Sequence, residues 1–167
     1  MGVFHILYEI HKMKASQQLL NQVQELESYI SSMTIKNEKI STSTVGWQID
    51  HSLKVFNLVC KALQDSDPSN FKNNVSLIGR LLLALGYFPR GKAKAPKQVQ
   101  PPELISVDDL NSQIKLAKNN ITSIDKLDKN AHFGHPLFKT LDLKKAIHFL
   151  SVHTEHHLKI IRDILKA

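Results

Sequence analysis

Four stretches of the chain carry apolar residues at intervals of three and four, the spacing of one face of an α-helix. They cover about 13–33, 42–65, 106–127 and 142–167, with Thr42 or Ser43 as the N-cap of the second and Ser106 as the N-cap of the third. No stretch shows the alternation of apolar and polar residues that is typical of a half-buried strand. Amphipathic helices bury their apolar stripes by packing against one another. The sequence therefore predicts an all-α fold, a four-helix bundle whose helices around Leu19, Val55, Ile114 and Ile160 share one core.

Three other segments connect the expected helices. Asp67-Pro68 ends the second helix, and residues 75–85 form a shorter apolar stretch that ends at Gly86, which we interpret as an accessory crossover helix. Residues 86–102 hold four of the six prolines and no regular periodicity, so we expect a long Pro/Lys-rich loop. Residues 132–140, with Gly134 and Pro136, are expected to form a turn-rich connection.

Length and cysteine content limit the classes of protein that fit. A chain of 167 residues can form one domain over 1–167 whose core needs no disulfide or structural metal. Cys60 is the only cysteine, which excludes an internal disulfide framework and a Cys-rich zinc module, so we expect a reducing, cytoplasmic location. The longest apolar run, 81–85, is too short to span a bilayer, and we expect no membrane partner. Residues 1–14 lack the pattern of a secretory signal, and whether 1–12 belong to the native start stays open.

The chain is basic, with 22 Lys and Arg against 15 Asp and Glu and a net charge of +7. Four of these cations lie in the loop at 90–97, namely Arg90, Lys92, Lys94 and Lys97. Near an open metal site they would raise the local concentration of an anionic ligand; elsewhere they would be solvated surface. Because the loop lacks interleaved aromatic residues and the chain lacks a helix-turn-helix or zinc-finger pattern, we do not expect sequence-specific nucleic-acid binding.

Histidine is unusually frequent, with nine copies, and two of them share a helix face. His153 and His157 are four residues apart, so they project one turn above the other. At 100° per residue, the apolar stripe of the last helix is centred near His157 and has His153 at its edge, so both are expected to point inward. His156 lies on the flank of this stripe and His148 on the opposite side, and we expect both to face solvent.

His51 supplies a third inward imidazole from the second helix, because it lies in a row with Trp47, Val55, Leu58 and Ala62. A single inward histidine is more often a core residue bonded to a backbone carbonyl. Three neutral imidazoles in an apolar core, however, need more polar partners than these faces offer, and a shared divalent cation meets that need. The pattern therefore predicts a metal site formed by His51, His153 and His157.

Other polar residues give weaker signals. His132 and His135 have a spacing compatible with a metal site, but the turn at Gly134-His135-Pro136 explains them. Asp50 projects about 100° away from His51, so we expect a surface or supporting group rather than a ligand. Glu155 faces away from the histidine pair, and no general base is evident.

At these residues the sequence resembles a known family. Residues 43–51 (STVGWQIDH) and 153–157 (HTEHH) are similar to the signature of the DinB-like (DinB/YfiT) superfamily of metalloenzymes, and the resemblance spans most of the chain. Residues 87–97 (YFPRGKAKAPK) and 135–138 (HPLF) indicate a separate branch of that superfamily.

The resemblance implies a four-helix bundle that holds zinc or nickel through His51, His153 and His157, with water in the remaining positions. It also implies activation of a low-molecular-weight thiol, as in thiol-dependent transferases and isomerases, and three neutral ligands favour such an anion at the metal. We therefore favour a thiol-dependent S-transferase acting on a small-molecule substrate. Two alternatives stay open: a metal-dependent hydrolase, and a non-catalytic protein that binds a small ligand or partner. The sequence does not identify the acceptor substrate, and it leaves open whether the chain forms a homodimer.

Overall fold

The computed structural model describes residues 3–91 and 95–166, with side chains from Lys14 onward within these ranges. Helices dominate the described chain: α1 (Val3–Ser28), α2 (Val45–Asp65), α3 (Leu77–Leu85), α4 (Val107–Ile124) and α5 (Leu143–Lys166). One antiparallel pair of strands, β1 (His132–His135) and β2 (Lys139–Asp142), completes the regular structure there, with single 3-10 turns at Ile30–Ser32, Pro68–Asn70 and Lys97–Val99. The prediction of a mainly helical protein is confirmed.

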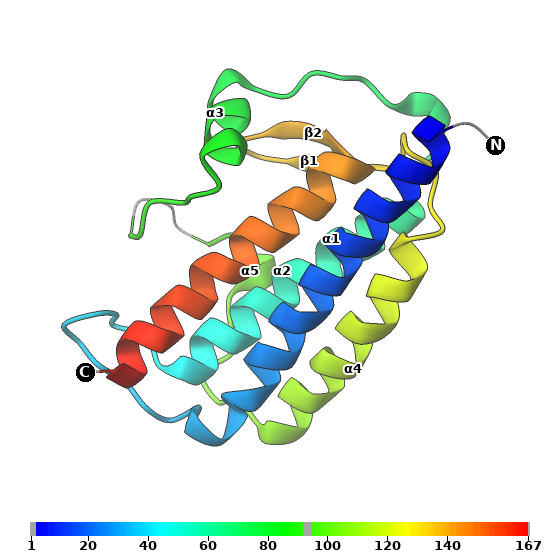
Figure 1. The fold of residues 1–167 in the computed structure, drawn as a ribbon. Helices are drawn as coiled ribbons and strands as arrows, with labels where there is room; N and C mark the ends of the chain where they lie inside the picture. The colour runs from blue at the N-terminus through cyan, green and yellow to red at the C-terminus, as the bar shows by residue number, and fades with distance from the viewer. Residues whose placement is uncertain (1–2, 92–94, 167) are drawn as a thin grey trace.

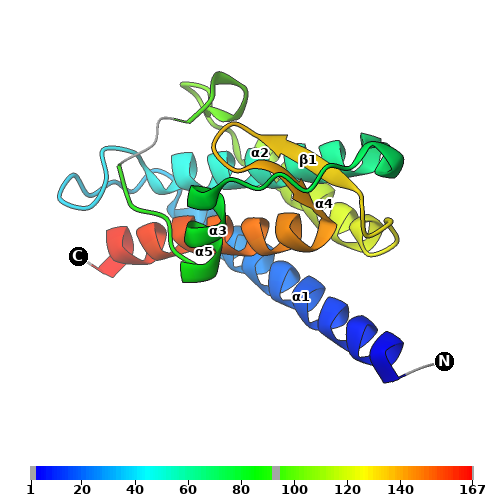
Figure 2. The ribbon, with the colours of Figure 1, turned by 90° about the horizontal axis from the view of Figure 1, so that it is seen from above.

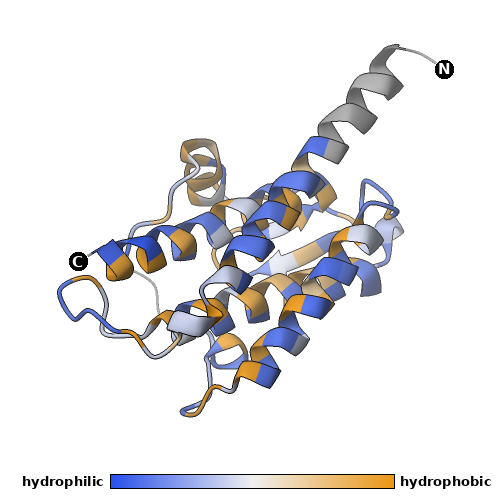
Figure 3. Cartoon of the chain, turned by 60° about the horizontal axis from the view of Figure 1, so that its bottom comes forward, coloured by the Kyte–Doolittle hydropathy of each residue, from blue (hydrophilic) through white to orange (hydrophobic). Residues whose placement is uncertain are grey.

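The four long helices lie side by side, and each contacts two of the others (Figure 1). α2 and α1 both pack against α4 and α5, so their apolar stripes meet in the middle. The four residues predicted to share a core do so: Leu19, Val55, Ile114 and Ile160. Viewed from another side, the helices show the polar and apolar stripes that produce this packing (Figure 3).

Side-chain caps fix where the helices start. Thr44 Oγ1 accepts a hydrogen bond from Trp47 N at 3.2 Å, so α2 begins at Val45 and the expected N-cap at Thr42 or Ser43 is slightly too early. The cap predicted at Ser106 is confirmed by its bond from Asp109 N at 3.0 Å. A cap that satisfies a free backbone N–H typically contributes about 1 kcal/mol to helix stability.

The first helix differs from the expectation at both ends, since α1 begins at Val3, before Met13, and stops at Ser28. The chain then turns so that Met33 O accepts a hydrogen bond from Gly46 N at 2.8 Å. A Cβ at position 46 would lie 2.9 Å from Met33 O, so only glycine allows this contact. This hydrogen bond between Met33 and α2 therefore takes the place of the last helical turn that the spacing of apolar residues predicts. α4 also ends earlier than expected, at Ile124.

The connection at 132–140 is a β-hairpin, so the absence of strands predicted from the sequence is wrong. Phe133 pairs with Leu141 in the hairpin register, and both side chains are buried against the helices. Strands of four residues offer only one inward position each, which is too short for alternation to be recognised in the sequence.

α3 is an accessory helix, as predicted, and lies outside the four long helices beside the hairpin (Figure 2). Ser76 N donates to Phe138 O at 3.2 Å, and Gly79 packs against Phe138. The loop expected after Gly86 is confirmed, apart from the turn at Lys97–Val99, while Lys92 and Lys94 lie outside the described residues. Among the described helices, none has the length and apolar character needed to cross a membrane.

Candidate metal centre

Three histidines from two helices converge between α2 and α5. One ring nitrogen each of His51, His153 and His157 lies within 4.8 Å of the other two. The ring centroid of His51 is 5.4 Å from that of His153 and 4.8 Å from that of His157, and the two α5 rings are 4.6 Å apart. His51 and His157 are buried, and His153 is half-buried. The structure thus brings together all three residues that the sequence singled out.

Two of these imidazoles are oriented by hydrogen bonds at Nδ1. His51 Nδ1 lies 2.8 Å from Val99 O, and His157 Nδ1 lies 2.7 Å from Gln48 Oε1. Both partners are carbonyl oxygens, which can only accept, so in each ring Nδ1 carries the proton. The lone pair of Nε2 is then free to bind a cation, which is the arrangement that supporting groups give to metal-ligating histidines.

Gln48 itself is held in the orientation that this role requires. Its side chain is 3% exposed, and its Nε2 donates to Ser41 Oγ at 3.3 Å. With the amide nitrogen used in this way, Oε1 must face His157, which fixes the assignment of the amide atoms. A buried polar side chain three residues before His51 is therefore a supporting group of the site.

His153 is held by packing. Its ring stacks on Phe149, with centroids 5.6 Å apart and planes 29° apart, and the Phe88 ring lies 6.4 Å away. No hydrogen bond joins this imidazole to any residue of the described chain. Among the three rings it alone has no hydrogen-bond partner at either nitrogen within the described part of the chain.

Burial keeps these imidazoles neutral. Loss of solvent lowers the pKa of His153 and of His157 well below the usual value of about 6.5, and each is lowered further by the charge that neighbouring histidines would carry. Burial also lowers the pKa of His51. Since a neutral ring is the form that binds a metal, the site presents three ligands at neutral pH without proton loss.

Aromatic side chains surround the histidines. Trp47 stacks on His51 with centroids 5.0 Å apart, and Phe88, from the loop after α3, lies against His153 and His156. This cover explains why the expectation of a solvent-facing His156 is wrong: its ring is half-buried and 5.0 Å from that of His157. Burial, followed by the charge of Arg90, lowers the pKa of His156.

The exposure of two further residues tests the helix faces predicted for α2 and α5. Leu58, expected inward, is 45% exposed, because at 100° per residue it lies about 60° from Val55 on the side away from the buried Phe56 and Val59. His148 is exposed as predicted, and its Nε2 donates to Leu83 O at 2.8 Å.

Asp50 is buried rather than at the surface. Its carboxylate lies 2.6 Å from Lys54 Nζ and accepts from Gln113 Nε2 at 2.8 Å, which ties α2 to α4. It is not among the groups that could share a metal with His51, so its predicted exclusion as a ligand agrees with the geometry of the described residues.

His132 and His135 serve the hairpin, as their turn interpretation predicts. His132 Nδ1 bonds Asn130 O at 3.0 Å, whereas His135 Nδ1 accepts from the backbone N–H of Leu137 and Phe138 at 3.1 and 3.3 Å. Both histidines therefore have local structural partners, and neither belongs to the metal cluster found among the described side chains.

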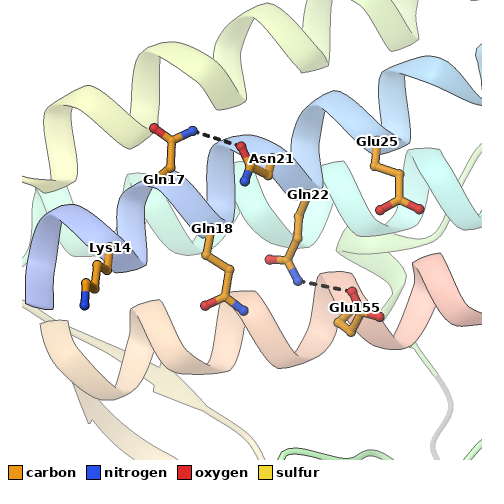
Figure 4. A pocket seen from close by; sticks show the side chains of 7 residues that line it. All are labelled: Lys14, Gln17, Gln18, Asn21, Gln22, Glu25 and Glu155. Carbon is orange, nitrogen blue, oxygen red and sulfur yellow. Dashed lines mark hydrogen bonds between the residues drawn. The ribbon is translucent and has the colours of Figure 1, made fainter.

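Glu155 points away from the histidines, toward α1. It accepts from Arg162 Nη1 at 2.7 Å, and Arg162 also forms two bonds of 2.7 Å with Glu25. These acids line a shallow polar hollow of about 370 Å³, drawn in Figure 4 and bordered by Lys14, Gln17, Gln18, Asn21, Gln22, Glu25 and Glu155. Its lining contains no histidine, so it is separate from the candidate metal centre.

Sequence reasoning missed Gln48, Val99 and Phe88 as parts of the site. Gln48 had a signal, because it lies one helical turn before His51 on the same face. The other two come from the loop after α3, whose path has no periodic pattern. Comparison of the chain with protein-family models, curated proteins and solved structures found no match.

The lowered pKa values predict that the stability of the metal-free protein depends on pH. Below about pH 6.5 the unfolded histidines take up protons that the folded ones exclude, so the free energy of unfolding decreases as pH falls. His157→Gln should reduce this slope by up to about 1.4 kcal/mol per pH unit, the value for one proton. Urea titrations across the range would measure it, with His148→Gln as control. Equal slopes for His157→Gln and wild type would contradict neutral burial of His157.

Proposed function

We propose that this chain is a metal protein that binds one divalent ion, zinc or nickel, through His51, His153 and His157. The observation that carries the proposal is the convergence of three ring nitrogens within 4.8 Å, with two of the rings oriented at Nδ1 by carbonyl oxygens. Metal–nitrogen bonds of about 2.0–2.1 Å would draw the nitrogens closer, and rotation of the imidazole side chains supplies this change.

A purely structural role for the three histidines explains less. A core histidine is typically held by a hydrogen bond from at least one of its ring nitrogens. Here His153 has no hydrogen-bond partner in the described chain, and one ring nitrogen each of His51 and His157 lies within 4.8 Å of one of its own. A shared cation would satisfy all three nitrogens at once.

We propose further that the four long helices form a four-helix bundle of the DinB-like type. Support comes from their shared core and from the origin of the histidines, which lie on the second and the last of the long helices. This matches the positions that the resemblance implies for the ligands. A bundle places the ligands of such a site on facing helices.

The proposed activity is transfer of a low-molecular-weight thiol, which binds as one substrate, to an electrophilic second substrate. When bound, the ion would favour the deprotonated form of a thiol at its open position. The three histidines would contribute no negative charge, and Trp47, Phe88 and Phe149 would limit access of water. The single cysteine of the chain, Cys60, does not suit the role of nucleophile, because burial raises its pKa to about 12.

Metal binding is tested by elemental analysis of protein purified without a histidine tag, then chelated and titrated with zinc or nickel. We expect about one ion per chain for wild type. Alanine at His51, His153 or His157 should weaken binding by more than the roughly 10–100-fold cost of losing a supporting residue. His148→Ala, an exposed histidine on the same helix, should bind like wild type. Stoichiometric metal retained in His157→Ala, or no uptake by wild type, would contradict the proposed ligands.

The reaction class is tested with a panel of low-molecular-weight thiols and electrophilic acceptors. We expect thiol consumption that stops on chelation and returns with the metal, and that is lost in His153→Ala. Cleavage of esters or amides without thiol would instead favour a hydrolase. Inactivity of the metal-loaded protein in both panels would contradict an enzymatic role and favour ligand or partner binding.

A further inference from the structure

The short helix α3 presents large aliphatic side chains to solvent. Leu77, Ile78, Leu81 and Leu85 are 82%, 56%, 58% and 62% exposed. At 100° per residue they occupy an arc about 100° wide. Gly79 and Leu83, the buried residues of α3, lie on the opposite side of the helix. The apolar arc therefore points directly away from the protein core.

Neighbouring residues extend this arc into a patch. Tyr87 follows α3 and is more than half exposed, and Leu137 lies at the tip of the hairpin, where its carbonyl accepts from Ser76 Oγ at 2.8 Å. We use the name α3 patch for Leu77, Ile78, Leu81, Leu85, Tyr87 and Leu137. In Figure 1 α3 lies at the edge of the molecule, outside the row of long helices. A contiguous group of exposed apolar side chains on such a projecting element marks an interaction site.

The charge of the surrounding segment identifies the kind of partner. Residues 68–102 contain six Lys and Arg and no Asp or Glu, whereas the other residues of the chain hold 16 cations and 15 anions. This segment therefore carries nearly all of the net charge of +7. Its exposed cations include Lys72 before α3 and Arg80 on the flank of the arc, and neither forms an ion pair with a described residue. Arg90 pairs with Asp163 at 2.7 Å.

We propose that the α3 patch docks on the surface of an anionic lipid bilayer. The aliphatic arc would enter the boundary between headgroups and acyl chains, and Tyr87 would lie at headgroup level. Lys72 and Arg80 would contact lipid phosphates while their alkyl stems stay with the apolar arc. Surface docking needs no spanning helix, and it revises the expectation of no membrane partner, which rested on the lack of a spanning stretch.

Two other occupants fit the patch less well. A second copy of the chain, related by a two-fold axis, would bring one acid-free segment against the other, and the like charges would repel. The core of a protein–protein interface is typically rich in aromatic residues and poor in Lys. Five of the six residues of the α3 patch are leucine or isoleucine, and Lys72 and Arg80 flank it, a composition that suits a phospholipid surface.

The test is sedimentation of the full chain with lipid vesicles. Vesicles of phosphatidylcholine and phosphatidylglycerol in equal parts are compared with phosphatidylcholine alone, at low and high salt. We expect binding to the anionic vesicles that weakens as salt rises. The double substitution Leu77→Glu with Leu81→Glu should reduce the partition coefficient at least about tenfold, since it removes apolar area and adds negative charge. Leu104→Glu with Leu116→Glu, at two exposed leucines outside the α3 patch, adds the same charge and is the matched control, which should bind like wild type.

Each other outcome overturns the proposal. Wild type that stays in the supernatant with anionic vesicles excludes the lipid surface, and equal binding by the double variant excludes the α3 patch as the docking element. A dimer in sedimentation velocity that the double substitution dissociates would assign the patch to a second copy. Both substituted leucines are exposed, so the melting temperature should change little, and metal content should not change. The result is therefore independent of the proposed metal chemistry.

Discussion

The packing of α2 against α5 is the contact on which the candidate site depends. It places His51 opposite two histidines on adjacent turns of α5, and it buries His51 and His157 while leaving His153 half-buried. Removal of water lowers the pKa values of His153 and His157 and keeps their nitrogens unprotonated. Gln48 from α2 and the Val99 carbonyl then accept from the Nδ1 atoms of His157 and His51, which leaves Nε2 of each ring unprotonated. Desolvation and orientation together give these three histidines the arrangement that the proposed metal centre requires.

The segment between α2 and α4 links this site to the molecular surface. It supplies the Val99 carbonyl and the Phe88 ring to the histidines, while α3, earlier in the same segment, projects its apolar arc outward. Residues 68–102 also hold almost all of the excess positive charge. One connection therefore carries both the cover of the proposed metal centre and the proposed bilayer-docking patch, so docking would place the site close to the lipid surface.

The sequence predicted the features that repeat along a helix. Spacing located the long helices and the inward faces of His51, His153 and His157, and cap chemistry located Ser106. Features that depend on contacts between distant segments could not be predicted. The hairpin strands are too short to alternate, the end of α1 depends on a contact between Met33 and Gly46, and the burial of His156 depends on Phe88 from a loop without periodicity. Gln48 was predictable in principle, because it shares a helix face with His51.

X-ray absorption at the metal edge tests the central claim most directly, because it counts the imidazoles around the bound ion. For wild-type protein loaded with zinc we predict three imidazole nitrogens at about 2.0–2.1 Å, with a water oxygen in the remaining position. In His153→Ala one imidazole should be lost from the spectrum and the other two retained, since His51 and His157 keep their Nδ1 partners. A spectrum with fewer than three imidazoles in wild type, or one unchanged in His153→Ala, would contradict the three-histidine centre.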